Sequence, residues 1–256
     1  MRLRQVCLVA RQLEPTVESL AALLDTEICY RDPGISFFGL ENALLPLGTD
    51  FLEVVAPIEA ETAASRHLER RGEGGYMLLI QCEDGKLARE RALGQGARAV
   101  WQHDENGIQA THFHPRSVPG AILSLDSMEP EPGELGPGLR WDWAGPDWRT
   151  HLRPNGIRGL AGARIEASQP EPAADRWSAV LGLPRGSGPE LSIALENGAL
   201  GFGANACPDA TLTAFGVLHS DPDAVLGRAE TLGFEIDGSR VSVAGVQIDL
   251  QSLRES

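Results

Sequence analysis

The sequence has few basic residues for its length. In 256 residues, 22 arginines and lysines stand against 36 aspartates and glutamates, which gives a formal net charge of −14. Only one basic residue is a lysine, Lys86. Nucleic-acid binding relies on basic surfaces that neutralise phosphates, so this charge balance argues against nucleic acid as a partner.

Long hydrophobic runs and paired cysteines are also missing. No apolar stretch reaches the roughly 18 residues that a membrane span needs. Arg11 and Gln12 interrupt the apolar stretch near the start of the chain, so we expect no secretory signal there. The four cysteines, at positions 7, 29, 82 and 207, form no CxxC pair. We therefore predict reduced thiols in a cytoplasmic protein that does not contact a membrane.

The length and the 42% hydrophobic content suffice for two domains that each bury a core. A Pro-, Gly- and Trp-rich stretch at 129–155 predicts a linker. We therefore expect one domain at residues 1–128 and a second at 156–256.

One pattern occurs four times: a strand, an amphipathic helix and about three further strands. Three of the four module helices are expected at 15–24, 84–93 and 221–232, and the remaining one carries Ala174, Trp177, Val180 and Leu181 on one side before Gly182. A polar connecting helix is expected at 58–71. The strands are expected at 5–10, 35–40, 43–47, 51–55, 76–82, 97–102, 108–114, 121–125, 160–167, 191–195, 199–202, 212–218, 239–243 and 246–250. Three helices end in Leu-Gly, at Gly94, Gly182 and Gly233, which is typical of a glycine in the left-handed position after a helix.

This repeat, the Leu-Gly helix ends and the segment 42–57 resemble the vicinal oxygen chelate superfamily, which includes glyoxalases, bleomycin-resistance proteins and ring-cleaving dioxygenases. The resemblance implies an α+β fold of two tandem glyoxalase-like domains, monomeric or homodimeric. Each domain would have two βαβββ modules, with a curled mixed sheet around a cleft. The second domain lacks the histidines and the carboxylate that a ring-cleaving dioxygenase needs, so we interpret it as a degenerate partner of the first.

The resemblance places the four metal-ligand positions of the family at Gln5, Glu53, Met77 and Ser124. Only Glu53 is a usual ligand, whereas a catalytic metal normally takes three protein ligands. We therefore expect the standard metal site to be absent. One divalent ion at a non-standard site, bound by Glu53 and His114, is the metal prediction that stays open.

Glu53 is the strongest single candidate because it interrupts an apolar run, on the face shared by Phe51 and Val55. A carboxylate there must be paired, hydrated in a cleft or raised in pKa. It is either a general base or metal ligand in the cleft, or one half of an ion pair with an arginine on an outer face of the sheet.

His112 and His114 share a face of an extended strand and could act with Glu53 as catalytic residues. The alternative is that they are half-exposed strand residues, with His114 bonding the turn that follows. A regular turn about residues 117–118 predicts that His112 pairs with Leu123. Ser124 and Asp126 would then face away from the histidines.

Further side chains are candidates for binding a substrate: Gln5, Cys7, Arg66, Tyr76, Met77, Gln81, Ser124 and Trp143. Arg66 is either an anion clamp or part of a solvated helix face. Trp141, Trp143 and Trp148 are either an aromatic lid over a planar ligand or the contact between two domains.

Two functions follow from the resemblance. The first is an enzyme that transfers a proton next to a carbonyl group of a small carbonyl-containing or aromatic metabolite, as a lyase or an isomerase. The second is a metal-free protein that binds and sequesters a small molecule, as bleomycin-resistance proteins do.

Overall fold

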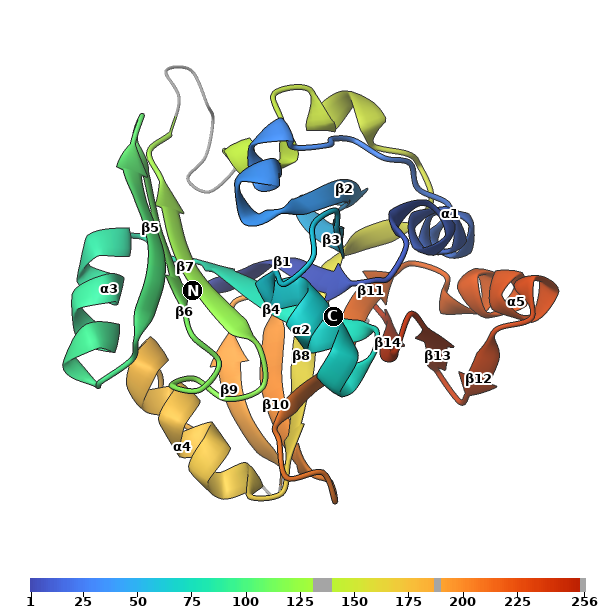
Figure 1. The fold of residues 1–256 in the computed structure, drawn as a ribbon. Coiled ribbons are helices and arrows are strands. Elements are labelled where there is room, and N and C mark those ends of the chain that lie inside the picture. Colours follow the sequence, from blue (N-terminus) through green and yellow to red (C-terminus); the bar gives the residue numbers. More distant parts are fainter. Residues whose placement is uncertain (131–139, 187–189, 254–256) are drawn as a thin grey trace. The chain divides into compact units, whose positions relative to one another are not determined.

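The computed structural model describes residues 1–130, 140–186 and 190–253. The described strands form two mixed seven-stranded sheets (Figure 1). The strand order is β2-β3-β1-β4-β7-β6-β5 in the first sheet and β12-β13-β14-β11-β8-β10-β9 in the second. The predicted α+β fold of tandem glyoxalase-like modules is confirmed. Residues 131–139 of the predicted linker lie outside the described residues.

The first sheet and its helices come from residues 2–128 and follow the predicted order. The elements are β1 (Arg2–Val9), α1 (Leu13–Leu24), the 3-10 helix η1 (Pro33–Phe38), β2 (Leu40–Leu47), β3 (Asp50–Pro57), α2 (Ala63–Arg71), β4 (Gly74–Gln81), α3 (Gly85–Gly94), β5 (Ala99–Glu105), β6 (Ile108–Phe113) and β7 (Ile122–Met128).

The second sheet follows two short 3-10 helices and has the same order of strands and module helices, without a described counterpart of η1 or α2. The elements are η2 (Asp142–Ala144), η3 (Trp148–His151), β8 (Ile157–Ala167), α4 (Pro170–Leu181), β9 (Leu191–Leu195), β10 (Gly198–Ala204), β11 (Thr211–His219), α5 (Pro222–Leu232), β12 (Glu235–Asp237), β13 (Arg240–Val243) and β14 (Val246–Ser252).

The prediction of a strand at 35–40 is wrong for most of its length. Residues 33–38 form η1, which begins with Pro33 and is capped by the Asp32 side chain, which accepts the N–H of Gly34. Proline fixes φ near its helical value and carries no N–H, so a short helix is favoured over a strand at this place. The described part of the first module is therefore βαββ, whereas β4 to β7 give the full βαβββ pattern.

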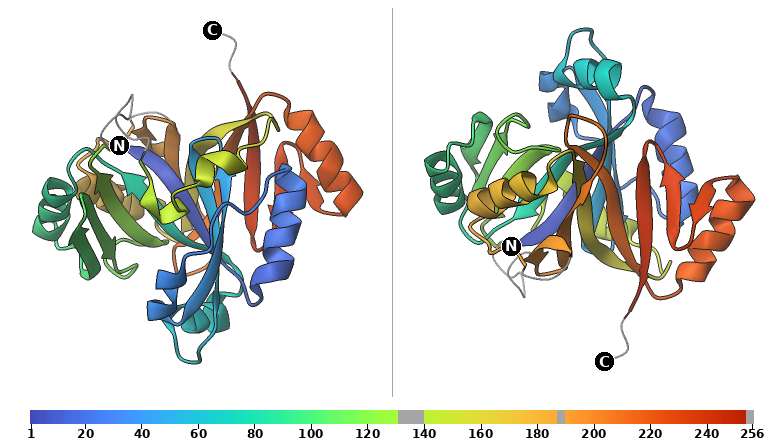
Figure 2. Two further views of the ribbon diagram at one scale, coloured as in Figure 1. Left: turned by 90° about the horizontal axis from the view of Figure 1, so that it is seen from above. Right: turned by 90° about the horizontal axis from the view of Figure 1, so that it is seen from below.

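Packing groups the chain into two compact units that each combine segments distant in sequence. The first unit contains Met1–Arg4, Tyr76–Trp141 and Gly162–Thr213, and the second contains Gln5–Gly75, Asp142–Ala161 and Ala214–Ser256. In the first unit α3 packs on α4, and in the second α1 packs on α5 (Figures 1 and 2). The boundaries predicted near residues 128 and 156 stay predictions.

Each helix pair is joined by an arginine that bonds the C-terminal turn of its neighbour. Arg91 Nε of α3 donates to the carbonyl of Val180 in α4 over 3.3 Å. Arg228 Nε of α5 donates to the carbonyl of Leu23 in α1 over 2.8 Å. Free carbonyls at a helix C-terminus carry partial negative charge, which a guanidinium offsets.

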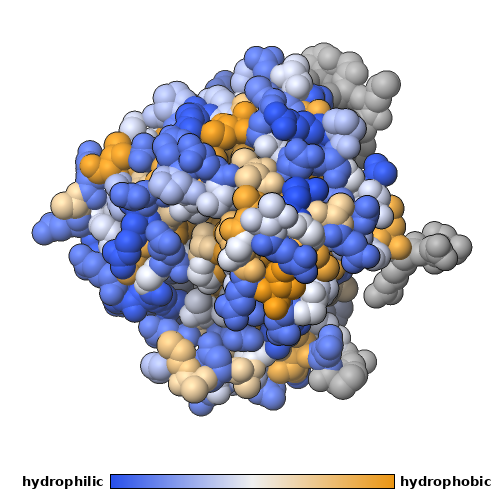
Figure 3. Space-filling view, turned by 90° about the vertical axis from the view of Figure 1, so that its right-hand side faces the viewer, coloured by the Kyte–Doolittle hydropathy of each residue, from blue (hydrophilic) through white to orange (hydrophobic). Residues whose placement is uncertain are grey.

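One face of the surface is mostly polar (Figure 3). Hydrophilic residues predominate on the face drawn in Figure 3, and apolar residues appear there in small patches. Phe37 in η1, at 80% exposure, is the most exposed of the large apolar side chains in the described residues. No helix within the described ranges is long and apolar enough to cross a membrane.

Candidate functional site

Glu53 lies on a face of the first sheet that three strands build together. In β3 it pairs with Cys7 of the parallel strand β1, while Phe51 pairs with Gln5. Directly paired residues share a face, so Gln5, Cys7, Phe51 and Glu53 point to the same side. Asn42 of the antiparallel strand β2 pairs with Val55 on that side. The second unit therefore brings together three predicted site residues, Gln5, Cys7 and Glu53.

Both carboxyl oxygens of Glu53 accept a hydrogen bond from an amide. Gln5 Nε2 donates to Oε2 over 2.9 Å, and Asn42 Nδ2 donates to Oε1 over 2.7 Å. Glu53 is 6% exposed. The prediction of an ion pair with an arginine has no support in these two bonds, because both donors are neutral.

Burial and hydrogen bonding shift the pKa of Glu53 in opposite directions. Desolvation is the largest effect and raises the pKa of Glu53, and the negative charge of Asp32 adds to it. Hydrogen bonds from Asn42, Cys7 and Gln5 lower the pKa, because they stabilise the charged form. The net direction is upward, which is typical of a carboxyl group poised for proton transfer.

Cys7 is buried against the same carboxyl group. Desolvation raises the pKa of the Cys7 thiol well above its ordinary value, and the charge of Glu53 raises it further. A thiol held in its protonated form is a poor nucleophile, since the thiolate is the reactive species. Cys7 therefore acts on Glu53 as a weak hydrogen-bond donor and not as a nucleophile.

The last part of the predicted linker, which holds η3, covers the face that carries Glu53. Trp148 in η3 is fully buried and meets Phe51 edge to face, with ring centroids 5.1 Å apart. Phe51 is two residues from Glu53 on the same face. Trp148 is thus the tryptophan in the described part of this unit that covers the candidate site, whereas the predicted ligand-binding residue Trp143 lies in η2 and is half-buried.

A second polar face lies in the first unit, on β4, β6 and β7. Gln81 pairs with Asp126, and Met77 pairs with Ile122, two residues from Ser124. His112 pairs with Ser124. Met77, Gln81, His112, Ser124 and Asp126 therefore share one face of the sheet.

The predicted pairing of His112 with Leu123 is therefore wrong by one residue. The chain between β6 and β7 takes one more residue than a regular turn about 117–118 would, so His112 pairs with Ser124, and Phe113 pairs with Leu123. A shift of one residue in register moves side chains to the opposite face. His112, Ser124 and Asp126 consequently point to the same side and not to opposite sides.

The two candidate histidines have different surroundings. The ring of His112 lies 4.4 Å from that of Trp101, and desolvation lowers the pKa of His112 to about 3. His114 organises the turn: its Nδ1 accepts the N–H of Arg116 over 3.0 Å, and its carbonyl accepts the Ser117 hydroxyl over 2.9 Å. These contacts support the interpretation that His114 bonds the turn. A catalytic role of His114 stays a prediction.

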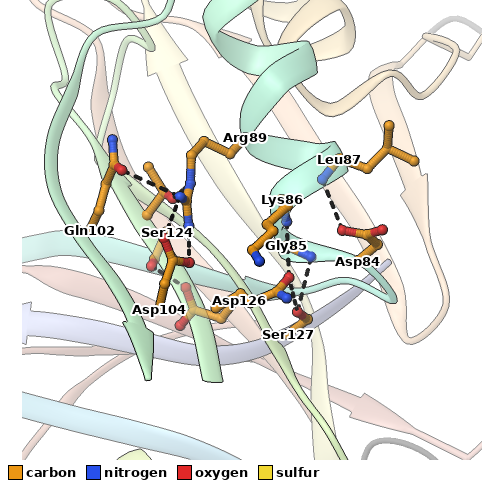
Figure 4. A network of polar contacts seen from close by, with 12 residues as sticks. Asp84, Gly85, Lys86, Leu87, Arg89, Gln102, Asp104, Ser124, Asp126 and Ser127 are labelled. Atoms are coloured by element: carbon orange, nitrogen blue, oxygen red, sulfur yellow. Dashed lines mark hydrogen bonds and ion pairs between the residues drawn. The ribbon is translucent and has the colours of Figure 1, made fainter. Parts of the chain in front are cut away.

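Helix α3 covers the opposite face of β5 and β6. Arg89 of α3 binds the carboxylate of Asp104, as Figure 4 shows, and the hydroxyl of Thr111. The N-terminus of α3 is capped by Asp84, whose side chain accepts the N–H of Leu87. These contacts anchor the helix to the sheet and account for the charges near α3.

Two further candidates have local partners. Arg66 is exposed in α2, and its guanidinium donates to the carbonyl of Glu61, five residues earlier. Tyr76 is buried on the face of β4 opposite to that of Met77 and Gln81. A ligand on the Gln81 face would therefore not meet Tyr76 on the same side of the strand.

Comparisons with known proteins decide the family. The glyoxalase-like domain family matches residues 6–181, which is more than half of the chain. The chain belongs to the glyoxalase-like domain family. No curated protein matches the sequence.

Solved structures of similar shape include a full-length match. A hypothetical protein from Staphylococcus aureus is 7% identical, with a TM-score of 0.67 over 98% of this chain and 99% of that chain. Methylmalonyl-CoA epimerase from Streptomyces coelicolor, in complex with 2-nitronate-propionyl-CoA, is 19% identical over 51% of this chain and 99% of its own, with a TM-score of 0.46. The Mycobacterium tuberculosis epimerase is 21% identical over 51% and 89% of the two chains, with a TM-score of 0.45. The full-length match shows that the Staphylococcus aureus protein shares the fold of the whole chain.

The side chains at the metal positions of the family do not fit a divalent ion. Gln5 uses its amide to bind Glu53, both oxygens of Glu53 already accept hydrogen bonds, and Met77 offers only a thioether. No three His, Cys, Asp or Glu residues in the described part of the chain lie close enough to hold a metal ion. A non-standard site with Glu53 and His114 stays a prediction.

Asn42 is the site residue that sequence reasoning missed. It lies in β2, where the other buried residues are apolar, and it is 4% exposed. A buried amide in an apolar strand requires hydrogen-bond partners, which was the available signal. The partner itself could be found only from the register of β2 against β3.

Proposed function

We propose that this glyoxalase-like protein transfers a proton next to the carbonyl group of a small carbonyl-containing or aromatic metabolite, with Glu53 as the base. The observation that carries the proposal is a carboxyl group at the family's glutamate position that is buried, raised in pKa and bonded through both oxygens by neutral amides. A carboxyl group whose pKa is raised can take up a proton from a substrate and return it.

The chemistry assigned to the site is that of a lyase or isomerase. The carboxylate of Glu53 removes a proton from the carbon beside the carbonyl, and the electron pair of that C–H bond moves into the substrate as an enolate. The glutamic acid then returns the proton to the same or a neighbouring carbon. In a lyase reaction the enolate instead expels a leaving group, which departs with the proton that Glu53 took up. A carboxylate has about four acceptor positions, so the two amide bonds leave room for the substrate proton.

Glu53→Gln tests this proposal because it keeps the size of the side chain and removes its acidity. Compounds that raise the melting temperature are first selected from 2-oxo acids, hydroxyketones, acyl thioesters and aromatic aldehydes. For those that react, we expect turnover to fall by about 10²- to 10⁴-fold in the variant, with little change in affinity. Turnover that survives in Glu53→Gln would contradict the role of Glu53 as the base.

The second candidate is a metal-free protein that binds a small molecule without converting it. It is favoured by the close burial of Glu53 beneath the segment that holds Trp148, and by the poor fit of the family's metal positions to a divalent ion. Here Glu53→Gln would weaken binding, and the wild-type protein would leave every bound compound unchanged. The two candidate functions thus differ in what Glu53→Gln loses: the rate of turnover in an enzyme, or the affinity for the ligand in a binding protein.

A further inference from the structure

We propose that Asn42 is a positioning residue that keeps Glu53 in its ionised form and fixes the direction of its carboxyl group. This inference rests on the proposed function, because it concerns proton transfer by the same carboxyl group. Asn42 lies in β2, next to β3, and its Nδ2 donates to Glu53 Oε1 over 2.7 Å.

The amide of Asn42 can be oriented in only one way. Its Oδ1 accepts the backbone N–H of Asp32 over 2.8 Å. A backbone N–H is a donor only, so Oδ1 must face Asp32, and the NH₂ group must face Glu53. The backbone N–H of Asp32, in the loop before η1, therefore fixes the amide of Asn42 so that its NH₂ group faces Oε1 of Glu53.

The hydrogen bond from Asn42 offsets part of the free-energy cost of burying the charge of Glu53. The described groups that shift the pKa of Glu53 are the amides of Asn42 and Gln5, the protonated thiol of Cys7 and the negative charge of Asp32. Burial and Asp32 favour the protonated acid, whereas the three hydrogen bonds favour the carboxylate. Without Asn42 the carboxyl group would keep its proton to a higher pH, and less of it could act as a base.

The direct test is the titration of Glu53 in full-length protein carrying Asn42→Asp or Asn42→Ala. Asn42→Asp keeps the shape and the acceptor for Asp32 but replaces the donor with an oxygen, and Asn42→Ala removes the amide without adding charge. The carboxylic C=O band in infrared spectra, identified by its loss in Glu53→Gln, reports protonation. We expect the midpoint to rise by about one pH unit or more in both variants.

Asn106→Asp is the matched control, since Asn106 lies in an exposed turn and the substitution adds the same charge. It should leave the Glu53 midpoint unchanged. A wild-type midpoint in folded Asn42→Ala and Asn42→Asp would overturn the positioning role, even if Glu53→Gln is inactive. If the wild type turns over a compound, its pH–rate profile should move upward with the Asn42 variants, whereas the titration result stands without any turnover.

Discussion

At the scale of single residues, Glu53 combines a charge with nearly complete burial. Burial raises its pKa, so the folded protein binds this proton more readily than the unfolded chain does. The stabilising contribution of Glu53 is therefore complete below the pKa of an unfolded glutamate, about 4.3, and is lost as the pH rises through the folded pKa.

This sign gives a pH-dependent prediction for Glu53→Gln. The variant stays neutral at every pH, so its stability relative to wild type should increase between about pH 5 and about pH 8. Urea unfolding of both proteins at the two pH values measures the difference. A difference that is constant, or that falls with rising pH, would contradict the direction assigned to the pKa of Glu53.

His112 gives a prediction of opposite sign. Desolvation lowers its pKa to about 3, so below an unfolded pKa of about 6.5 the unfolded chain takes up a proton that the folded protein does not. Its stabilising contribution is present above about pH 6.5 and is lost as the pH falls. Between about pH 7 and about pH 5, wild type should lose roughly 1 kcal/mol more stability than His112→Gln, since the ring is partly exposed. Equal losses would show that His112 titrates normally.

The partners of these residues were harder to predict than the residues themselves. Glu53 stood out because it interrupts an apolar run, but its bond to Asn42 depends on the register of two strands. The face shared by His112 and Ser124 depends on one additional residue in a turn. Sequence periodicity gives the spacing within a strand, whereas register comes from the packing of both strands.

At the scale of elements, strands and helices were predictable because their periodicity is local. All four module helices are present, and α1, α3 and α5 have bounds close to those expected. Of the three Leu-Gly helix ends, Gly182 and Gly233 adopt the left-handed conformation with φ of 67° and 76°. Gly94 does not: it is the last residue of α3, and Gly96 has the positive φ instead.

These three glycines allow a matched comparison of substitutions by alanine. Gly233→Ala should cost about 1 kcal/mol, because its backbone is left-handed and no atom lies within 4 Å of a new Cβ. Gly182→Ala should cost more, about 2 kcal/mol, since its Cβ would also lie 2.6 Å from Cδ of Arg91. Gly94→Ala should stabilise α3 by about 0.5–1 kcal/mol.

Thermal unfolding of the three variants beside wild type measures these differences. The order of stability should be Gly94→Ala, wild type, Gly233→Ala and Gly182→Ala. A destabilised Gly94→Ala would contradict the assignment of Gly94 to the helix.

At the scale of the whole molecule, the chain order does not predict how segments pack. The repeat indicates two successive pairs of modules, and each sheet is indeed built from one such pair. The compact units instead combine segments from both halves of the chain. Contacts such as Arg228 with Leu23, or Trp148 with Phe51, join residues that are far apart in the sequence and leave no periodic signal.

This packing predicts how a fragment behaves. Residues 1–128 alone lack Trp148 over Phe51 and the helix α5 that packs on α1. We expect the fragment to unfold without a cooperative transition, because it would expose these apolar surfaces to water. Circular dichroism during heating tests this expectation. Cooperative unfolding near the melting temperature of the whole protein would support independent domains bounded near residues 128 and 156.

The most direct test of the central claim is hydrogen exchange between solvent and a bound carbonyl compound. Proton NMR in D₂O would follow the C–H signal beside the carbonyl for a compound that raises the melting temperature of both wild type and Glu53→Gln. We predict that the wild-type protein accelerates loss of this signal and that Glu53→Gln, at equal saturation, does not. Equal exchange in both proteins, or none in wild type, would contradict proton transfer by Glu53 and leave a binding protein.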